Sequence, residues 1–151
     1  MMDIAQLTAH LHLLHRSFRH YVGRDLGGLV WEGESTARVL DDAPFVLLSH
    51  NTAADPVFTY GNRAALQLFA MDWDTLTHLP SRYSAEPLAR EEREHLLQTV
   101  SRQGYIDNYA GVRIASNGQR FLIQNAIVWN LHDIQGNHAG QAAFFDQWHY
   151  I

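Results

Sequence analysis

The sequence contains no cysteine, and all eleven of its basic residues are arginine. Without cysteine the chain cannot form disulfides, thiolate metal sites or a cysteine nucleophile, and flavin photochemistry through a cysteinyl adduct is excluded. A chain free of cysteine fits the reducing cytoplasm best, and we expect it there.

Long apolar runs are also missing. The first thirty residues mix apolar positions with four histidines and three arginines, and no later segment is long enough to cross a bilayer. We therefore expect neither secretion nor a membrane partner.

Positive charge is sparse as well. The net charge is −5 with histidine neutral, and the arginines are spread along the chain. Because a nucleic-acid site needs clustered cations, we expect no direct nucleic-acid binding. The chain has 151 residues, 46% of them hydrophobic, which suits one core of ordinary domain size.

An amphipathic helix is predicted at the N-terminus, ending near Gly23. Its stripe recurs at three- and four-residue spacing, at Ile4, Leu7, Leu11, Leu14 and Phe18. This stripe has two alternative partners, the protein's own sheet or a second copy, and we expect a homodimer. Residues 1–42 are assigned to this helix and a connecting segment, and residues 43–151 to the core.

The core pattern predicts two strands, a helical middle and three further strands. The last three strands follow a helix that begins at Pro87 and ends at Gly104, and Asn117-Gly118 between two of them is a hairpin signal. The expected ranges are strands 45–48, 57–60, 105–115, 120–130 and 140–145, with a helix over 62–71. This order resembles a PAS domain, and it predicts an α+β fold with a five-stranded antiparallel sheet and helices covering one face.

Several sequence words resemble the MEKHLA family. They are FVLLSHN at 45–51, DPVFTYGNRAA at 55–65, SRYSAE at 81–86, GVRI at 111–114 and VWN at 128–130. The resemblance covers nearly the whole chain and matches the free-standing bacterial type. It implies a PAS-related sensory or regulatory module that also occurs at the C-terminus of plant class III homeodomain-leucine zipper factors. It implies no particular ligand.

Candidate ligand-binding residues lie on the expected last strands. Alternation places Tyr105, Tyr109 and Arg113 on one face of their strand. On the next strand it places Asn125 and Trp129 on one face and Gln124 on the other. With Gln141, these polar groups offer hydrogen bonds to a small molecule. The alternative is that they satisfy neighbouring backbone groups or face solvent.

The loop over residues 79–86 supplies Arg82 and Tyr83 as further candidates. The guanidinium of Arg82 could clamp a carboxylate or phosphate. The alternative is an ion pair with a nearby carboxylate that holds the loop in place.

Cofactor and enzyme motifs are weak. His95 falls outside the apolar stripe of its helix, which disfavours haem ligation, and His12 and His15 lack a carboxylate that would complete a metal site. Ser49 and His50 are adjacent on a strand and point to opposite faces, so they cannot form a catalytic pair. We therefore expect a sensory module that binds a small ligand and signals through another molecule. An interaction or dimerisation module without a ligand is the alternative, and an enzyme is a weaker one.

Overall fold

The computed structural model describes the backbone of residues 1–151 and every side chain except that of Leu88. The helices are α1 (Ile4–Val22), α2 (Glu34–Asp41), α3 (Arg63–Phe69), α4 (Trp73–Leu76) and α5 (Pro87–Gln103), with short 3-10 turns η1 (Leu26–Gly28) and η2 (Ser81–Ser84). The strands are β1 (Val46–His50), β2 (Phe58–Gly61), β3 (Tyr105–Ile114), β4 (Arg120–His132), β5 (His138–Phe145) and β6 (Gln147–Tyr150). The predicted α+β class is confirmed.

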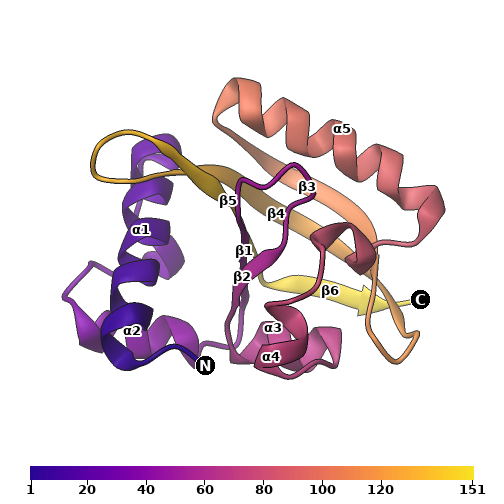
Figure 1. Cartoon of the computed structure of the whole chain (residues 1–151), viewed down its shortest axis with the longest axis horizontal. Helices are drawn as coiled ribbons and strands as arrows, with labels where there is room; N and C mark the ends of the chain where they lie inside the picture. Colours follow the sequence, from indigo (N-terminus) through magenta and orange to yellow (C-terminus); the bar gives the residue numbers. More distant parts are fainter.

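All strands belong to one antiparallel sheet in the order β2-β1-β5-β4-β3 (Figure 1). The predicted meander of the last three long strands is present, with its turn at Asn117-Gly118. The sequence pattern did not predict β6, which follows β5 after Asp146. It pairs with the first half of β4 and continues the register in which β5 pairs with the second half. The sheet therefore has one strand more than predicted.

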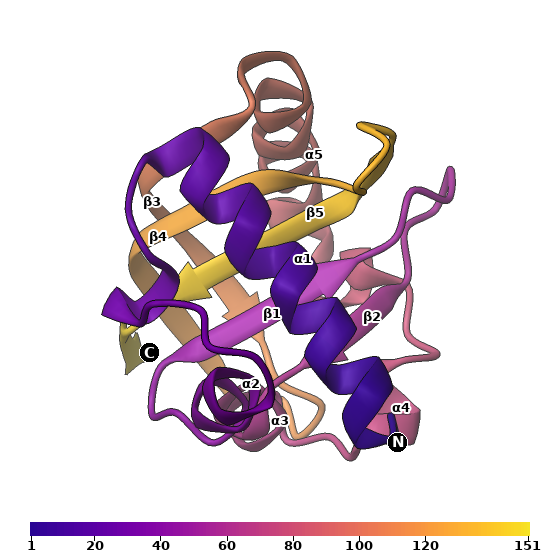
Figure 2. The ribbon, with the colours of Figure 1, turned by 90° about the vertical axis from the view of Figure 1, so that its left-hand side faces the viewer.

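Helix α1 lies across one face of the sheet (Figure 2). Asp3 and Gln6 form a capping box at its start, and Gly23 in the left-handed conformation ends it. Leu11, Leu14 and Phe18 are buried, and the indole of Trp129 donates to the Leu14 carbonyl at 3.3 Å. Of the two alternative partners for the apolar stripe, the structure shows the first: the stripe packs against the protein's own sheet.

Helix α2 was not predicted, because the segment before it is rich in glycine. It begins after Gly33 and buries Thr36, Ala37 and Leu40. Leu40 belongs to the same hydrophobic cluster as Leu14 and Trp129, so residues 1–42 share a core with the sheet.

The other face of the sheet is covered by α3, α4 and α5 (Figure 1). Asn62 caps α3 by accepting from the backbone of Ala65 at 3.1 Å. Helix α5 begins with Pro87, ends at Gly104 and packs Leu96 and Val100 against Val128. Two helical layers thus enclose the sheet.

Irregularities in β3 and β4 change which side chains share a face. Asn108 and Asn125 have positive φ angles of 54° and 53°, and the register of the two strands shifts beside them. As a result Phe121 and Ile123 pack on the α5 side, whereas Ile127 and Trp129 pack on the α1 side. The alternation expected over residues 120–130 is wrong beyond Asn125, because a bulge reverses it.

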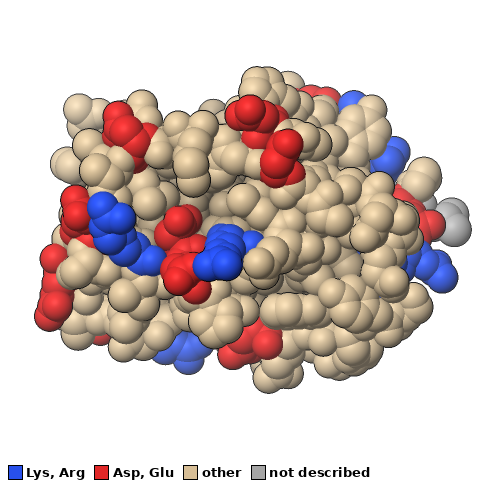
Figure 3. All heavy atoms as spheres, turned by 90° about the horizontal axis from the view of Figure 1, so that it is seen from below, with Lys and Arg blue, Asp and Glu red and all other residues tan. Residues whose placement is uncertain are grey.

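No helix in the described part of the chain is both long and apolar enough to span a bilayer. On the face seen in Figure 3, arginines and acidic residues are interspersed.

Candidate functional site

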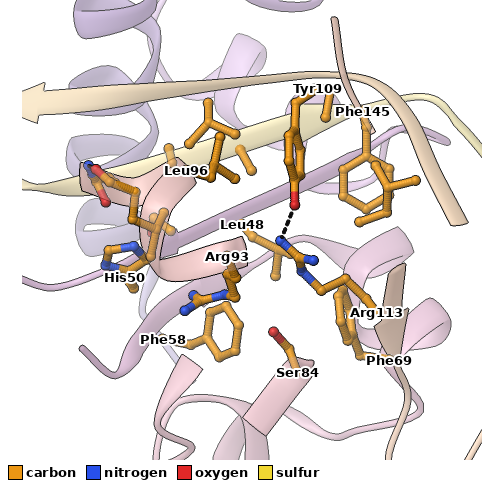
Figure 4. A pocket seen from close by; sticks show the side chains of 18 residues that line it. Leu48, His50, Phe58, Phe69, Ser84, Arg93, Leu96, Tyr109, Arg113 and Phe145 are labelled. Atoms are coloured by element: carbon orange, nitrogen blue, oxygen red, sulfur yellow. Dashed lines mark hydrogen bonds between the residues drawn. The ribbon is translucent and has the colours of Figure 1, made fainter. Parts of the chain in front are cut away.

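A cavity of about 70 Å³ lies between α5 and the sheet. Most of its wall is apolar and comes from Leu48, Phe58, Phe69, Leu96 and Phe145 (Figure 4). The polar side chains that reach it are those of His50, Ser84, Arg93, Tyr109, Arg113 and Gln141. An apolar cavity with a few convergent polar groups is the usual form of a small-molecule site.

Two arginines on different elements line this cavity. Arg93 from α5 and Arg113 from β3 are each only 7% exposed. The guanidinium of Arg93 donates to the hydroxyl of Ser81 at 2.8 Å, and that of Arg113 donates to the Val112 carbonyl at 2.9 Å. Among the described side chains, neither arginine has a carboxylate oxygen within 4.0 Å.

Burial, together with the positive charge of Arg113, lowers the pKa of Arg93 to about 10. At neutral pH Arg93 is still charged. Burying a cation without a paired anion is costly, and two such cations repel each other. The cavity is therefore strongly electropositive.

Tyr109 links Arg113 to the protein surface. Its hydroxyl accepts from Arg113 at 3.0 Å and donates to Glu92 of α5 at 3.1 Å. Gly111 leaves the space that this phenol needs, because a Cβ at that position would collide with the tyrosine ring. Glu92 is exposed, so its charge offsets that of Arg113 from a distance and through an intervening hydroxyl.

His50 from β1 lies in the cavity wall and is 8% exposed. Its Nδ1 lies 3.0 Å from the Asn51 carbonyl, which assigns the proton to Nδ1. Burial lowers the pKa of His50 to about 4, so the ring is neutral at pH 7. Within the described part of the chain, Nε2 is buried and has no hydrogen-bond partner.

Gln141 joins α5 to the sheet at the edge of the cavity. Its amide nitrogen donates to the Leu97 carbonyl at 3.1 Å, to the Ser101 hydroxyl at 3.2 Å and to Asn130 at 3.1 Å. Asn130 in turn donates to the Val100 carbonyl at 3.0 Å. This polar cluster holds the second half of α5 against β4 and β5.

Of the residues predicted as ligand contacts, Tyr109, Arg113 and Gln141 line the cavity. Arg82 and Tyr83 do not. Arg82 pairs with Asp55 at 3.1 Å and lies over the ring of Tyr83, which is 45% exposed. The alternative given for Arg82, an ion pair that holds the loop, describes the structure.

The predictions for Gln124, Asn125 and Trp129 also miss the cavity wall. Asn125 forms the bulge in β4 and donates to Gln147 at 2.7 Å. Trp129 is fully buried beneath α1, on the opposite face of the sheet. For Asn125 and Trp129 the bulge is the physical reason, because it exchanges the faces on either side of Asn125. Gln124 follows Ile123 of the cavity wall and therefore lies on the other face.

Sequence reasoning missed Arg93 and considered His50 only as a catalytic partner of Ser49. A signal for Arg93 was present, because it lies three residues before Leu96 and seven before Val100, on the buried stripe of α5. His95, by contrast, is exposed as expected. A charged residue within an apolar helix stripe is a better pointer to a site than polar residues on a strand.

A family model for the MEKHLA domain matches residues 8–150. The chain belongs to the MEKHLA family. It is also 27% identical over 129 residues to the homeobox-leucine zipper protein ATHB-9 of Arabidopsis thaliana, a match that covers 82% of this chain and 15% of that protein. The MEKHLA chain thus spans a small part of the length of this relative.

Solved structures with the same fold include a PAS domain from Colwellia psychrerythraea. It has a TM-score of 0.65 at 12% identity, and the match covers 78% of this chain and 95% of that one. A light-oxygen-voltage domain studied with a flavin analogue has a TM-score of 0.61 at 14% identity, covering 78% and 84%. At these identities the likeness shows a PAS-like fold.

The cavity does not fit a flavin of the kind studied in that light-oxygen-voltage domain. Its volume of about 70 Å³ lies well below the roughly 300–1,000 Å³ of sites for drug-sized ligands. Two charged arginine side chains also reach into the region between α5 and the sheet (Figure 4). The described residues contain no group of three or more histidine, cysteine or acidic side chains that could hold a metal ion.

Proposed function

We propose that this MEKHLA protein is a sensory module whose cavity binds a small organic anion, such as a short carboxylate. The observation that carries the proposal is the pair of buried arginines, Arg93 and Arg113, without a carboxylate partner. A ligand carboxylate would supply the missing negative charge. It would also accept the remaining guanidinium N–H groups, in the paired geometry that arginine favours.

The size and the walls of the cavity restrict the ligand further. A volume of about 70 Å³ holds roughly five to seven water-sized groups. The apolar wall from Phe58, Phe69 and Phe145 favours a short hydrocarbon body over a second charged group. A monocarboxylate of three to five carbons meets both conditions.

Signal output would use α5, because it carries one of the two arginines. A ligand held between Arg93 on α5 and Arg113 on β3 draws the helix and the sheet together. The polar cluster of Gln141 and Asn130 already couples the second half of this helix to β4 and β5. A change at α5 reaches the surface, where another molecule can respond to it.

A non-catalytic role agrees with the placement of the one close serine–histidine contact among the hydrogen bonds of the described residues. Ser49 Oγ lies 2.8 Å from His10 Nε2, but Ser49 is 1% exposed and also contacts Thr59 at 2.8 Å. A substrate could not reach this hydroxyl. We propose binding without catalysis.

Isothermal titration calorimetry tests the proposal. Propionate and butyrate are compared with the neutral amides propionamide and butyramide. We expect saturable binding of at least one acid and at least about tenfold weaker binding of its amide, because the amide lacks the charge that the arginines require. Arg93→Met and Arg113→Met should each weaken binding at least about tenfold.

Arg82→Met is the matched control, because its guanidinium is paired with Asp55 on an exposed loop, and it should leave the affinity unchanged. If the amides bind as well as the acids, or if no acid binds, the anion-sensing function is wrong. The interaction module without a ligand then becomes the better account.

A further inference from the structure

In the cavity wall (Figure 4), Nε2 of His50 is buried without a hydrogen-bond partner among the described residues. The side chain is 8% exposed. Because Nδ1 carries the proton and donates a hydrogen bond to the Asn51 carbonyl, Nε2 presents a lone pair. A buried acceptor without a donor is costly, and a bound molecule could satisfy it.

Building on the proposed anion site, we infer that the ligand is a short hydroxy acid, with its carboxylate on Arg93 and Arg113 and its hydroxyl donating to His50. The hydroxyl would complete the hydrogen bonding of the histidine in the same way that the carboxylate completes that of the arginines. One molecule then supplies both the anion for the two arginines and the hydrogen-bond donor for His50.

The donor on the ligand should be neutral. The positive charge of Arg93 acts on His50, so an ammonium group placed beside this ring would meet a like charge. An amino acid is therefore a poorer fit than a hydroxy acid of the same length. The cavity of about 70 Å³ has room for roughly three to five carbons in all, so the hydroxyl should lie on the second or third carbon.

The test compares ligands that differ in one group. Each enantiomer of lactate is titrated against isobutyrate, and each enantiomer of 3-hydroxybutyrate against 3-methylbutyrate, because a methyl group replaces the hydroxyl at nearly constant shape. We expect one hydroxy acid to bind the wild-type protein at least about tenfold more tightly than its methyl counterpart. One enantiomer should bind better than the other, because the arginines and His50 fix two points of the molecule.

Two variants test whether His50 accepts the hydrogen bond from the ligand hydroxyl. His50→Leu removes the acceptor and should reverse the preference toward the methyl compound. His50→Gln keeps an acceptor oxygen and should retain part of the preference for the hydroxy acid. If either variant is unfolded by circular dichroism, the wild-type comparison still decides whether the hydroxyl is recognised. A shift of the His50 Nε2 nuclear magnetic resonance signal on adding the hydroxy acid, absent with its methyl counterpart, then decides whether His50 accepts the hydrogen bond.

The outcomes separate the two proposals. Equal binding of hydroxy and methyl acids overturns the role of His50 and leaves the anion site standing. Binding of neither kind of acid overturns both. A preference for the hydroxy acid that His50→Leu does not reduce overturns the assignment of His50 as the acceptor of the ligand hydroxyl.

Discussion

At the scale of single residues, the cavity is set by charges that folding alone would not favour. Arg93 occupies a position on the buried stripe of α5 where an apolar residue would pack against the sheet, and Arg113 brings a second guanidinium to the same space. Each must be desolvated, and the two repel each other. Residues that cost stability in the free protein are best explained by what they bind.

Replacing one of these arginines should therefore stabilise the free protein. We expect Arg93→Met to raise the free energy of unfolding by about 1–2 kcal/mol, because it removes a buried charge and keeps most of the volume. Urea denaturation followed by circular dichroism measures this, with Arg82→Met as a control that changes stability by less than about 0.5 kcal/mol. A loss of stability in Arg93→Met would show that the arginine is structural.

Asn125 gives a second test at this scale, because its positive φ sets which side chains of β4 face the cavity. Asn125→Ala should be less stable than Asn125→Gly by about 1 kcal/mol, since alanine resists the left-handed conformation and glycine does not. Both variants lose the bond to Gln147, so the difference isolates the backbone. Equal stability would mean that the bulge relaxes without cost.

At the scale of elements, the two helical layers have separate tasks. Helix α1 buries Leu11, Leu14 and Phe18 against the face that carries Trp129. Helix α5 covers the opposite face and encloses the cavity. Stability and binding should therefore respond to different helices.

Leu14→Ala tests this separation. The variant should lose about 2–5 kcal/mol of unfolding free energy, because Leu14 is fully buried beneath the helix. Where the protein is still folded, its affinity for propionate should match that of the wild type. Val39→Ala is the control, since Val39 is 53% exposed and should cost little. A binding loss in folded Leu14→Ala would couple the layers and contradict the division.

Local signals account for the elements that the sequence predicted well. The capping residues Asp3 and Asn62, the stop at Gly23 and the turn at Asn117-Gly118 all act within a few neighbours along the chain. The bulges, β6 and the placement of Trp129 depend on pairing between distant strands, which no local pattern contains. Tyr109 and Arg113 were found because alternation along one strand places them on one face, whereas the local signal for Arg93, its position on the buried stripe of α5, was not used.

At the scale of the whole molecule, histidines make stability depend on pH. Burial lowers the pKa values of His10 and His50 to about 4, against an ordinary value of 6.5. Between these values the unfolded chain binds more protons than the folded protein. Stability is therefore full above pH 6.5 and is lost as the pH falls toward 4.

We expect the free energy of unfolding to fall by roughly 2–4 kcal/mol between pH 7 and pH 5. Urea denaturation at a series of pH values measures it. His50→Leu should remove about half of the dependence, because only His10 then contributes strongly in this window. A stability that is flat from pH 7 to pH 5 would show that these rings are not buried in their neutral form.

The most direct test of the central claim is a nuclear magnetic resonance titration of the arginine side chains with propionate. The account predicts that the Nε–H signals of Arg93 and Arg113 shift together and saturate at one dissociation constant, while that of Arg82 stays in place. If Arg93 and Arg113 do not shift, or if all the arginines shift alike without saturation, the cavity is not an anion site.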